Sequence, residues 1–125
     1  MNALQERILR ACLKPAVECD LPGRLRLRFA RADRLPEQAL PYLHYIPEVM
    51  QLLPGVGEVS CNVRIGTVLV KYDAQKVSAE RILEWIGAVV DEGVTLAGEG
   101  AWRASDEERL RALALERLKR RVSRF

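Results

Sequence analysis

The stretch RLRLRF at residues 24–29 alternates strictly between basic and apolar residues. Such a period of two is typical of a β-strand that has one face against a hydrophobic core. The apolar residues of this strand then lie on the covered face, and Arg24, Arg26 and Arg28 lie on the opposite face. The pattern therefore predicts a half-buried strand with an arginine-rich outer side.

A second alternating stretch, residues 59–64, is followed by Gly66 and by a β-branched run at residues 67–72. Two such runs joined by a short loop containing glycine predict a β-hairpin. Cys61 shares the apolar side of its strand, so we expect a packed thiol on the core side of the sheet.

Helical spacing of apolar residues predicts a broken helix before this hairpin, because Pro41 and Pro47 interrupt the pattern. After the hairpin, Ser78 is placed to cap a helix that we expect to end at Gly93, and a short last strand is expected at 94–97. The stretches with helical spacing are 2–13, 35–53, 78–93 and 105–125.

The predicted order of elements from residue 21 onward is strand, helix, strand, strand, helix, strand. This order favours an α+β fold, the ferredoxin-like βαββαβ sandwich, with additional helices at the N-terminus and the C-terminus. The 125 residues suit one such domain. We expect an N-terminal amphipathic helix and linker (1–20), the ferredoxin-like domain (21–97), and a connection with a C-terminal amphipathic basic helix (98–125).

Several segments of the second half resemble the heavy-metal-associated domain family. They are LPGVGEVSCNV, VLVKYD and VSAERILEWI, which match that family's Gly-Val turn, Val-x-x-Asn strand, Tyr-Asp strand end and capped helix. The start of the domain, LPGRLRLRF, is similar to a divergent branch with an arginine-rich first strand. The resemblance implies a non-catalytic binding or regulatory module, associated with a metal-transport ATPase or a related membrane system.

Metal-carrying members of that family hold a soft cation with a Cys-x-x-Cys pair between the first strand and the first helix. In this chain the corresponding loop is ARADRLPEQ, which contains arginines and no cysteine. Thiolates bind Cu(I) and Zn(II), whereas arginines repel cations, so we expect no bound metal and no cofactor. The alternative is a metal-binding protein, or a haem-binding one, that uses the non-standard ligands Cys12, Cys19 or His44.

The composition sets further limits. Hydrophobic residues make up 49% and charged residues 30% of the chain, as in a globular domain. No apolar run approaches the roughly 20 residues that span a bilayer, and the three cysteines fit a reducing compartment. We therefore expect a cytoplasmic protein, either free or peripheral to a membrane. With a single histidine, no nucleophile motif and no glycine-rich phosphate loop, we do not expect an enzyme.

The arginine face is the first candidate binding surface. Arg24, Arg26 and Arg28 would stand on the open face of the sheet, beside Arg64 and Lys71 from the hairpin. Two interpretations are open: a solvated strand face, or a docking surface for an acidic partner segment or for the protein's own acidic residues. Nucleic acid is the less favoured partner, because RNA-binding sheets stack bases on aromatic side chains and these positions carry none.

The C-terminal helix is the second candidate surface. Ser105 and Glu108 form a capping-box pattern at its start, and it carries an apolar stripe that would need cover. The alternatives for its cover are its own domain, a second copy of the chain, another protein or an anionic membrane. We expect the helix to be an interaction element, and the main residues of its stripe are Leu110, Leu118, Val122 and Phe125.

Overall fold

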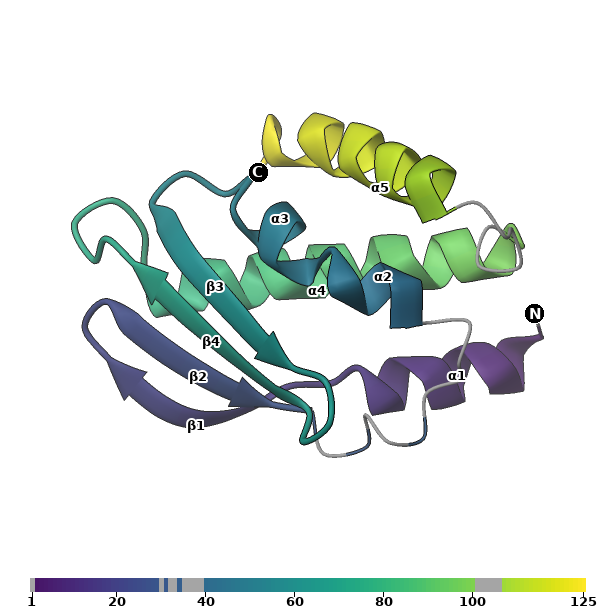
Figure 1. Cartoon of the computed structure of the whole chain (residues 1–125), viewed down its shortest axis with the longest axis horizontal. Coiled ribbons are helices and arrows are strands. Elements are labelled where there is room, and N and C mark those ends of the chain that lie inside the picture. Colours follow the sequence, from purple (N-terminus) through teal and green to yellow (C-terminus); the bar gives the residue numbers. More distant parts are fainter. Residues whose placement is uncertain (1, 30, 32–33, 35–39, 101–106) are drawn as a thin grey trace.

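The structure, a computed structural model, describes residues 2–29, 31, 34, 40–100 and 107–125. This part of the chain forms a mixed α+β fold with one four-stranded antiparallel sheet and five helices (Figure 1). The strands are β1 (Ala16–Leu21), β2 (Arg24–Arg28), β3 (Val56–Asn62) and β4 (Thr67–Tyr72), and the helices are α1 (Ala3–Cys12), α2 (Leu40–His44), α3 (Ile46–Met50), α4 (Ala79–Gly98) and α5 (Glu107–Val122). Within the described residues, no helix has the length and apolar character needed to cross a bilayer.

The strand order in the sheet is β1-β2-β4-β3. The predicted hairpin is confirmed, because β3 pairs with β4 on either side of a turn that contains Gly66. The predicted arginine strand is confirmed as β2, which pairs with β4 and has both leucines fully buried. The ferredoxin-like arrangement is not confirmed, because this strand order is not clearly of that type.

The strand predicted at 94–97 is wrong, because α4 continues through these residues to Gly98. Gly93 does not end the helix. Its missing side chain makes room for the ring of Tyr42, since a Cβ atom at this position would lie 2.6 Å from Cε1 of that ring. The hydroxyl of Tyr42 donates a hydrogen bond to the carbonyl oxygen of Val89 at 2.8 Å. Val94 and Leu96, which suggested the strand, instead fill the buried side of the helix.

The place beside β2 is taken by β1, in a segment predicted to be a linker. Strand β1 pairs with β2 through a tight turn in which Gly23 has a φ of 80°. A glycine adopts this left-handed conformation without steric cost. The pairing shifts register between Val17 and Cys19, which marks a β-bulge.

The core lies between one face of the sheet and the helices. Leu25 and Leu27 of β2 meet Val70 of β4 and Trp85 of α4, and all four side chains are fully buried. The indole of Trp85 donates a hydrogen bond to the carbonyl oxygen of Val49 at 3.1 Å, so its one polar atom is satisfied. This core fixes which face of the sheet is covered.

Local side-chain signals mark the starts of α1 and α4 and the break in the predicted long helix. Asn2 and Gln5 form a reciprocal capping box on α1. Ser78 accepts a hydrogen bond at the start of α4. The predicted broken helix is divided at Tyr45 into α2 and α3, with Pro47 in the first turn of α3.

Helix α5 packs on the helical layer of its own chain, where it lies along α4 (Figure 1). Leu110, Ala114 and Leu118 are buried in the common core. Beyond the helix, the ring of Phe125 packs edge-on against Trp85 with the ring centroids 5.2 Å apart. The capping box expected from Ser105 lies outside the described residues.

Candidate functional site

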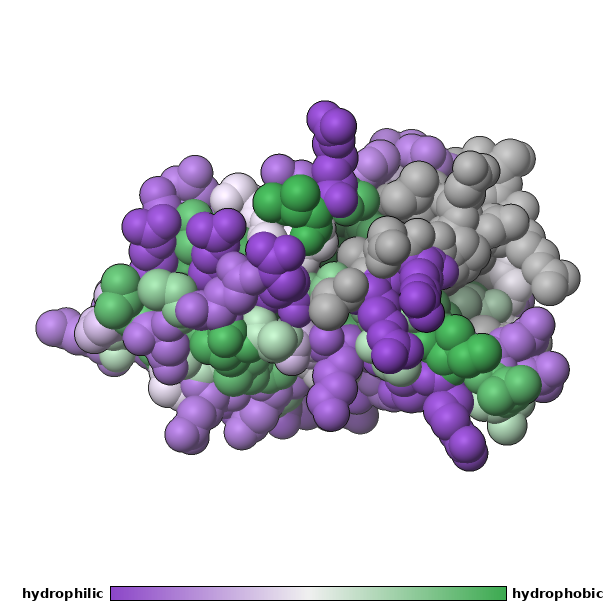
Figure 2. Space-filling model, turned by 90° about the horizontal axis from the view of Figure 1, so that it is seen from below, coloured by the Kyte–Doolittle hydropathy of each residue, from purple (hydrophilic) through white to green (hydrophobic). Residues whose placement is uncertain are grey.

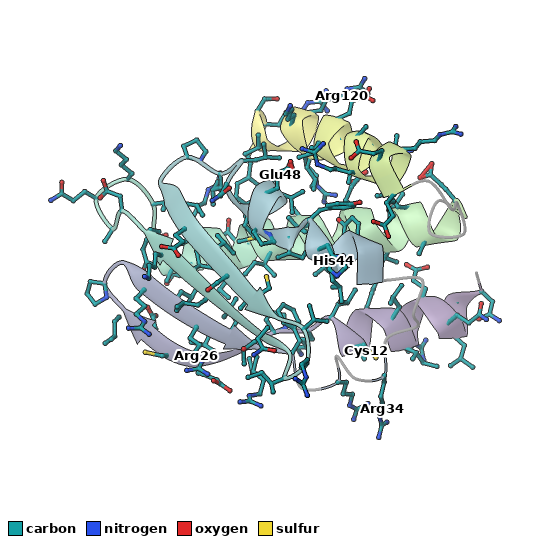
Figure 3. All side chains as sticks on the ribbon, viewed as in Figure 1. Cys12, Arg26, Arg34, His44, Glu48 and Arg120 are labelled. Atoms are coloured by element: carbon teal, nitrogen blue, oxygen red, sulfur yellow. The ribbon has the colours of Figure 1, made fainter. Side chains whose placement is uncertain are left out.

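The open face of the sheet carries a row of cations. Arg24, Arg26 and Arg28 are exposed on β2, because the buried leucines between them point into the core. Lys71 of β4 lies directly opposite Arg24 in the strand register. Figure 3 shows Arg26 on the side of the sheet that points away from the helices.

Two of these arginines hold a carboxylate from the neighbouring strand. Nε of Arg28 donates a hydrogen bond to Glu18, and Nε of Arg26 lies 3.3 Å from Oε2 of the same side chain. Glu18 sits in the bulge of β1, which turns its side chain toward the open face. The hydrogen bond from Arg28 lowers the pKa of Glu18 below its ordinary value, so this carboxylate is ionised at neutral pH.

Glu18 is not among the site residues predicted from the sequence. The sequence pattern around Glu18 does not distinguish a strand from a linker. The contact of Glu18 with the arginines depends on the pairing of β1 with β2. The available signal was the Pro22-Gly23 turn, which makes a hairpin between the two flanking segments geometrically simple.

A hollow beside Arg26 extends the cationic row toward the hairpin. It encloses about 220 Å³ and is lined by groups from β2, β3 and β4. The guanidinium, hydroxyl and amide groups on its wall are all hydrogen-bond donors. The hollow therefore suits an oxygen-bearing anion, and its lining comprises Arg26, Ser60, Cys61, Asn62, Thr67 and Leu69.

Arg64 is not part of this surface. It lies in the turn between β3 and β4, where its backbone N–H donates to the side chain of Asn62 at 3.2 Å. The structure thus brings together Arg24, Arg26 and Arg28 but places Arg64 at the end of the hairpin.

The second candidate surface, on the C-terminal helix, is covered by the chain itself. Leu110 and Leu118 are buried against the rest of the protein, and Val122 and Phe125 are partly buried against the same core. The guanidinium carbon of Arg81 lies 3.8 Å from the centroid of the Phe125 ring. The expectation that this stripe is open to a partner is therefore wrong for the two leucines, because α4 already buries them.

Ion pairs between α5 and α4 strengthen this attachment. Arg121 of α5 lies 2.9 Å from Asp91 and 3.1 Å from Glu92. Arg117 also contacts Glu92, with a separation of 3.7 Å. Because the acidic residues come from α4 and the basic ones from α5, the charges hold the two helices in one register.

The residues considered as metal ligands lie on different elements. Cys12 is buried near the end of α1, Cys19 lies on β1, and His44 is exposed on α2 (Figure 3). Among the described residues, no three His, Cys, Asp or Glu side chains come together as a metal would require. Glu48 of α3, four residues after His44, accepts a hydrogen bond from Nε of Arg111 at 3.0 Å.

Cys61 lines an apolar cavity of about 70 Å³ between the sheet and the helices. Burial raises the pKa of its thiol to about 11, so it stays protonated at neutral pH. The surrounding side chains are almost entirely apolar, and they include Phe29, Leu43, Ile46, Met50, Val68 and Val90. A neutral thiol in such a setting acts as a small packing group, as the alternation of its strand predicts.

No protein-family model, curated protein or solved structure matches this chain. The resemblance to heavy-metal-associated domains and the link to metal transport therefore stay predictions.

Proposed function

We propose that the protein is a non-catalytic binding module whose open sheet face binds an acidic segment of a protein partner. The observation that carries this proposal is the carboxylate of Glu18, which is held between Arg26 and Arg28. The arginines of this face therefore bind a carboxylate of their own chain, and we propose that they bind a partner's carboxylates in the same way.

The surroundings of this pair favour further acidic groups. Arg24 and Lys71 extend the cationic row along the sheet, and the hollow beside Arg26 adds neutral donors. Among the described residues, the acidic side chains paired with these cations are Glu18 and Glu58, the latter 3.7 Å from Lys71, so the row of four cations stays net positive. An extended segment with alternating acidic side chains matches the spacing of the β2 arginines, because both have a period of two residues.

Nucleic acid fits this surface less well. The outward side chains on β2 and β4 are the three arginines, Thr67, Leu69 and Lys71. None of them is aromatic. The phosphates of a single-stranded nucleic acid could therefore contact the cations, but its bases would have no aromatic side chain on which to stack.

In this arrangement Glu18 competes with the partner. A partner carboxylate that reaches Arg26 and Arg28 must share or displace the internal one. Removing the charge of Glu18 should therefore strengthen binding, whereas removing the two arginines should weaken it.

The test is a fluorescence anisotropy titration with a labelled oligoglutamate peptide, with an oligolysine peptide as the negative control. Glu18→Gln should tighten binding by up to about fivefold, the range of one exposed ion pair. Arg26→Gln with Arg28→Gln should weaken it by about tenfold. The double variant Lys119→Gln, Arg120→Gln removes the same charge from the exposed side of α5 and should change binding little. Equal weakening by both double variants would show a general charge effect and would contradict the proposed site.

We also propose that the sheet is a ferredoxin-like arrangement in which β1 occupies the edge expected for the last strand. Two findings support this: β1 pairs antiparallel with β2, and the predicted last strand is part of α4. On the resemblance to heavy-metal-associated domains, we propose that the partner belongs to a metal-transport ATPase or a related membrane system. Retention of one Cu(I) or Zn(II) per chain, lost on replacing Cys12 and Cys19 by serine, would instead support the metal-binding interpretation.

A further inference from the structure

The large apolar side chains that the structure leaves exposed gather on three neighbouring elements. These are α1, β1 and the turn between β3 and β4, which form the lower margin of the protein in Figure 1. Seen from below, hydrophobic side chains stand in separate patches among hydrophilic ones (Figure 2). The exposed apolar residues are Leu4, Ile8, Val17, Leu21, Val63 and Ile65.

Helix α1 has two different apolar sides. Leu9 and Cys12 face the core and are buried, whereas Leu4 and Ile8 are 63% and 55% exposed. Leu4 and Ile8 are one helical turn apart, so they stand next to each other on the outer side. An exposed pair of this kind has no cover within the described residues and is costly to leave in water.

Cations surround these exposed side chains. Arg7 shares the outer side of α1 with Leu4, by the same helical spacing, and Lys14 is exposed just after the helix. Arg64 stands between Val63 and Ile65 at the tip of the hairpin. Arg31 and Arg34 are also exposed, and Figure 3 shows Arg34 at the lower margin near Cys12.

These five cations are not neutralised within the described part of the chain. Ion pairs there involve other basic residues, such as Arg10, which lies 3.2 Å from Glu6 and 2.9 Å from Asp91. The acidic residues of α1 and β1 are Glu6, Glu18 and Asp20, of which Glu6 and Glu18 are already bound by arginines and Asp20 is exposed. The free charge around the apolar side chains is therefore predominantly positive.

We infer that this side of the protein binds the surface of an anionic lipid bilayer, with α1 lying in the plane of the interface. Exposed apolar side chains flanked by lysine and arginine are the features of interfacial helices. The apolar groups enter the boundary of the acyl chains, and the cations meet the negative headgroups. The charge around the patch is the reason for choosing a membrane over a second copy of the chain, since two copies would bring like charges together.

This inference does not rest on the proposed function, because the residues of α1 and of the hairpin turn are not those that hold Glu18. The probe is a set of vesicles of phosphatidylcholine with roughly one-third phosphatidylserine, compared with pure phosphatidylcholine vesicles in a co-sedimentation assay. The full chain should bind the anionic vesicles, bind the neutral ones at least tenfold more weakly, and lose affinity as salt is raised.

Substitutions on α1 make the test specific. Ile8→Glu should weaken binding to the anionic vesicles by at least about tenfold, since an apolar contact becomes a repelled charge. Ala112→Glu adds the same charge at an exposed position of α5. It should weaken binding only by the small effect of one additional negative charge on the whole protein. Arg7→Gln with Lys14→Gln should weaken this binding roughly thirtyfold, since it removes two charges.

Circular dichroism should show that each variant stays folded, because the substituted side chains are exposed. Equal binding of Ile8→Glu and Ala112→Glu, or equal binding of the full chain to neutral and anionic vesicles, would overturn the inference. So would an absence of vesicle binding together with a dimer, seen by light scattering, that Ile8→Glu dissociates. In that outcome the patch joins two copies of the chain.

Discussion

Replacing Leu118 by alanine tests whether α5 is a structural part of the fold. The side chain of Leu118 is fully buried between α5 and the rest of the helical layer. A Leu→Ala change at such a site loses the transfer free energy of the removed methyl groups and leaves a cavity, at a total cost of about 2.7 to 5 kcal/mol. Because α5 lies at the outside of the core and can partly close the cavity, we expect a value of about 3 kcal/mol.

The matched control is Leu4→Ala. It makes the same substitution in a helix, so the change in helix propensity is the same, but Leu4 is 63% exposed. Its cost should stay within about 0.5 kcal/mol. The difference between the two variants in free energy of unfolding therefore measures the packing of Leu118 alone.

Urea unfolding followed by far-UV circular dichroism measures both variants. With an m value of about 2 kcal/mol/M, Leu118→Ala should lower the midpoint by roughly 1.5 M, whereas Leu4→Ala should leave it nearly unchanged. A chain that ends at Gly100 should lose its cooperative transition, since it lacks Leu110, Ala114 and Leu118. Equal midpoints for the two alanine variants would refute the reasoning and would mean that α5 is detached from α4 in solution.

Two glycines of α4 should respond in opposite directions to alanine. Gly87→Ala should stabilise the protein by about 0.5 to 1 kcal/mol, because the new Cβ atom meets no atom within 4 Å. Gly93→Ala should destabilise the protein, because its Cβ atom would clash with the ring of Tyr42, and thermal unfolding measures both variants. Cys61→Val should be tolerated and Cys61→Asp should lower the melting temperature, since burial there disfavours a charge. The pKa of Glu18 should lie below its ordinary value in a carboxyl NMR titration and return toward it in Arg28→Gln. The stabilisation from this carboxylate should accordingly be complete above its ordinary pKa and be lost as the pH falls through the lowered one.

Part of the site was predictable from the sequence and part was not. The exposed row of Arg24, Arg26 and Arg28 follows from the alternation of β2 alone, because successive side chains of a strand point to opposite faces. The carboxylate between Arg26 and Arg28 could not be predicted in this way. It depends on which strand pairs with β2 and on a bulge in that strand, and both are set by contacts between distant parts of the backbone.

The sequence by itself determined the elements whose signals are local. Alternation gave β2 and the hairpin, side-chain caps set the starts of α1 and α4, and a proline divided α2 from α3. The tertiary structure decided the outcome where a local sequence signal is compatible with two structures. Gly93 can end a helix or admit a neighbouring ring, and Tyr42, which lies far away in the chain, selects the second. An apolar stripe indicates that a helix is covered but not by which surface. Only the packing of the whole chain could therefore show that α4 of the same chain buries Leu118.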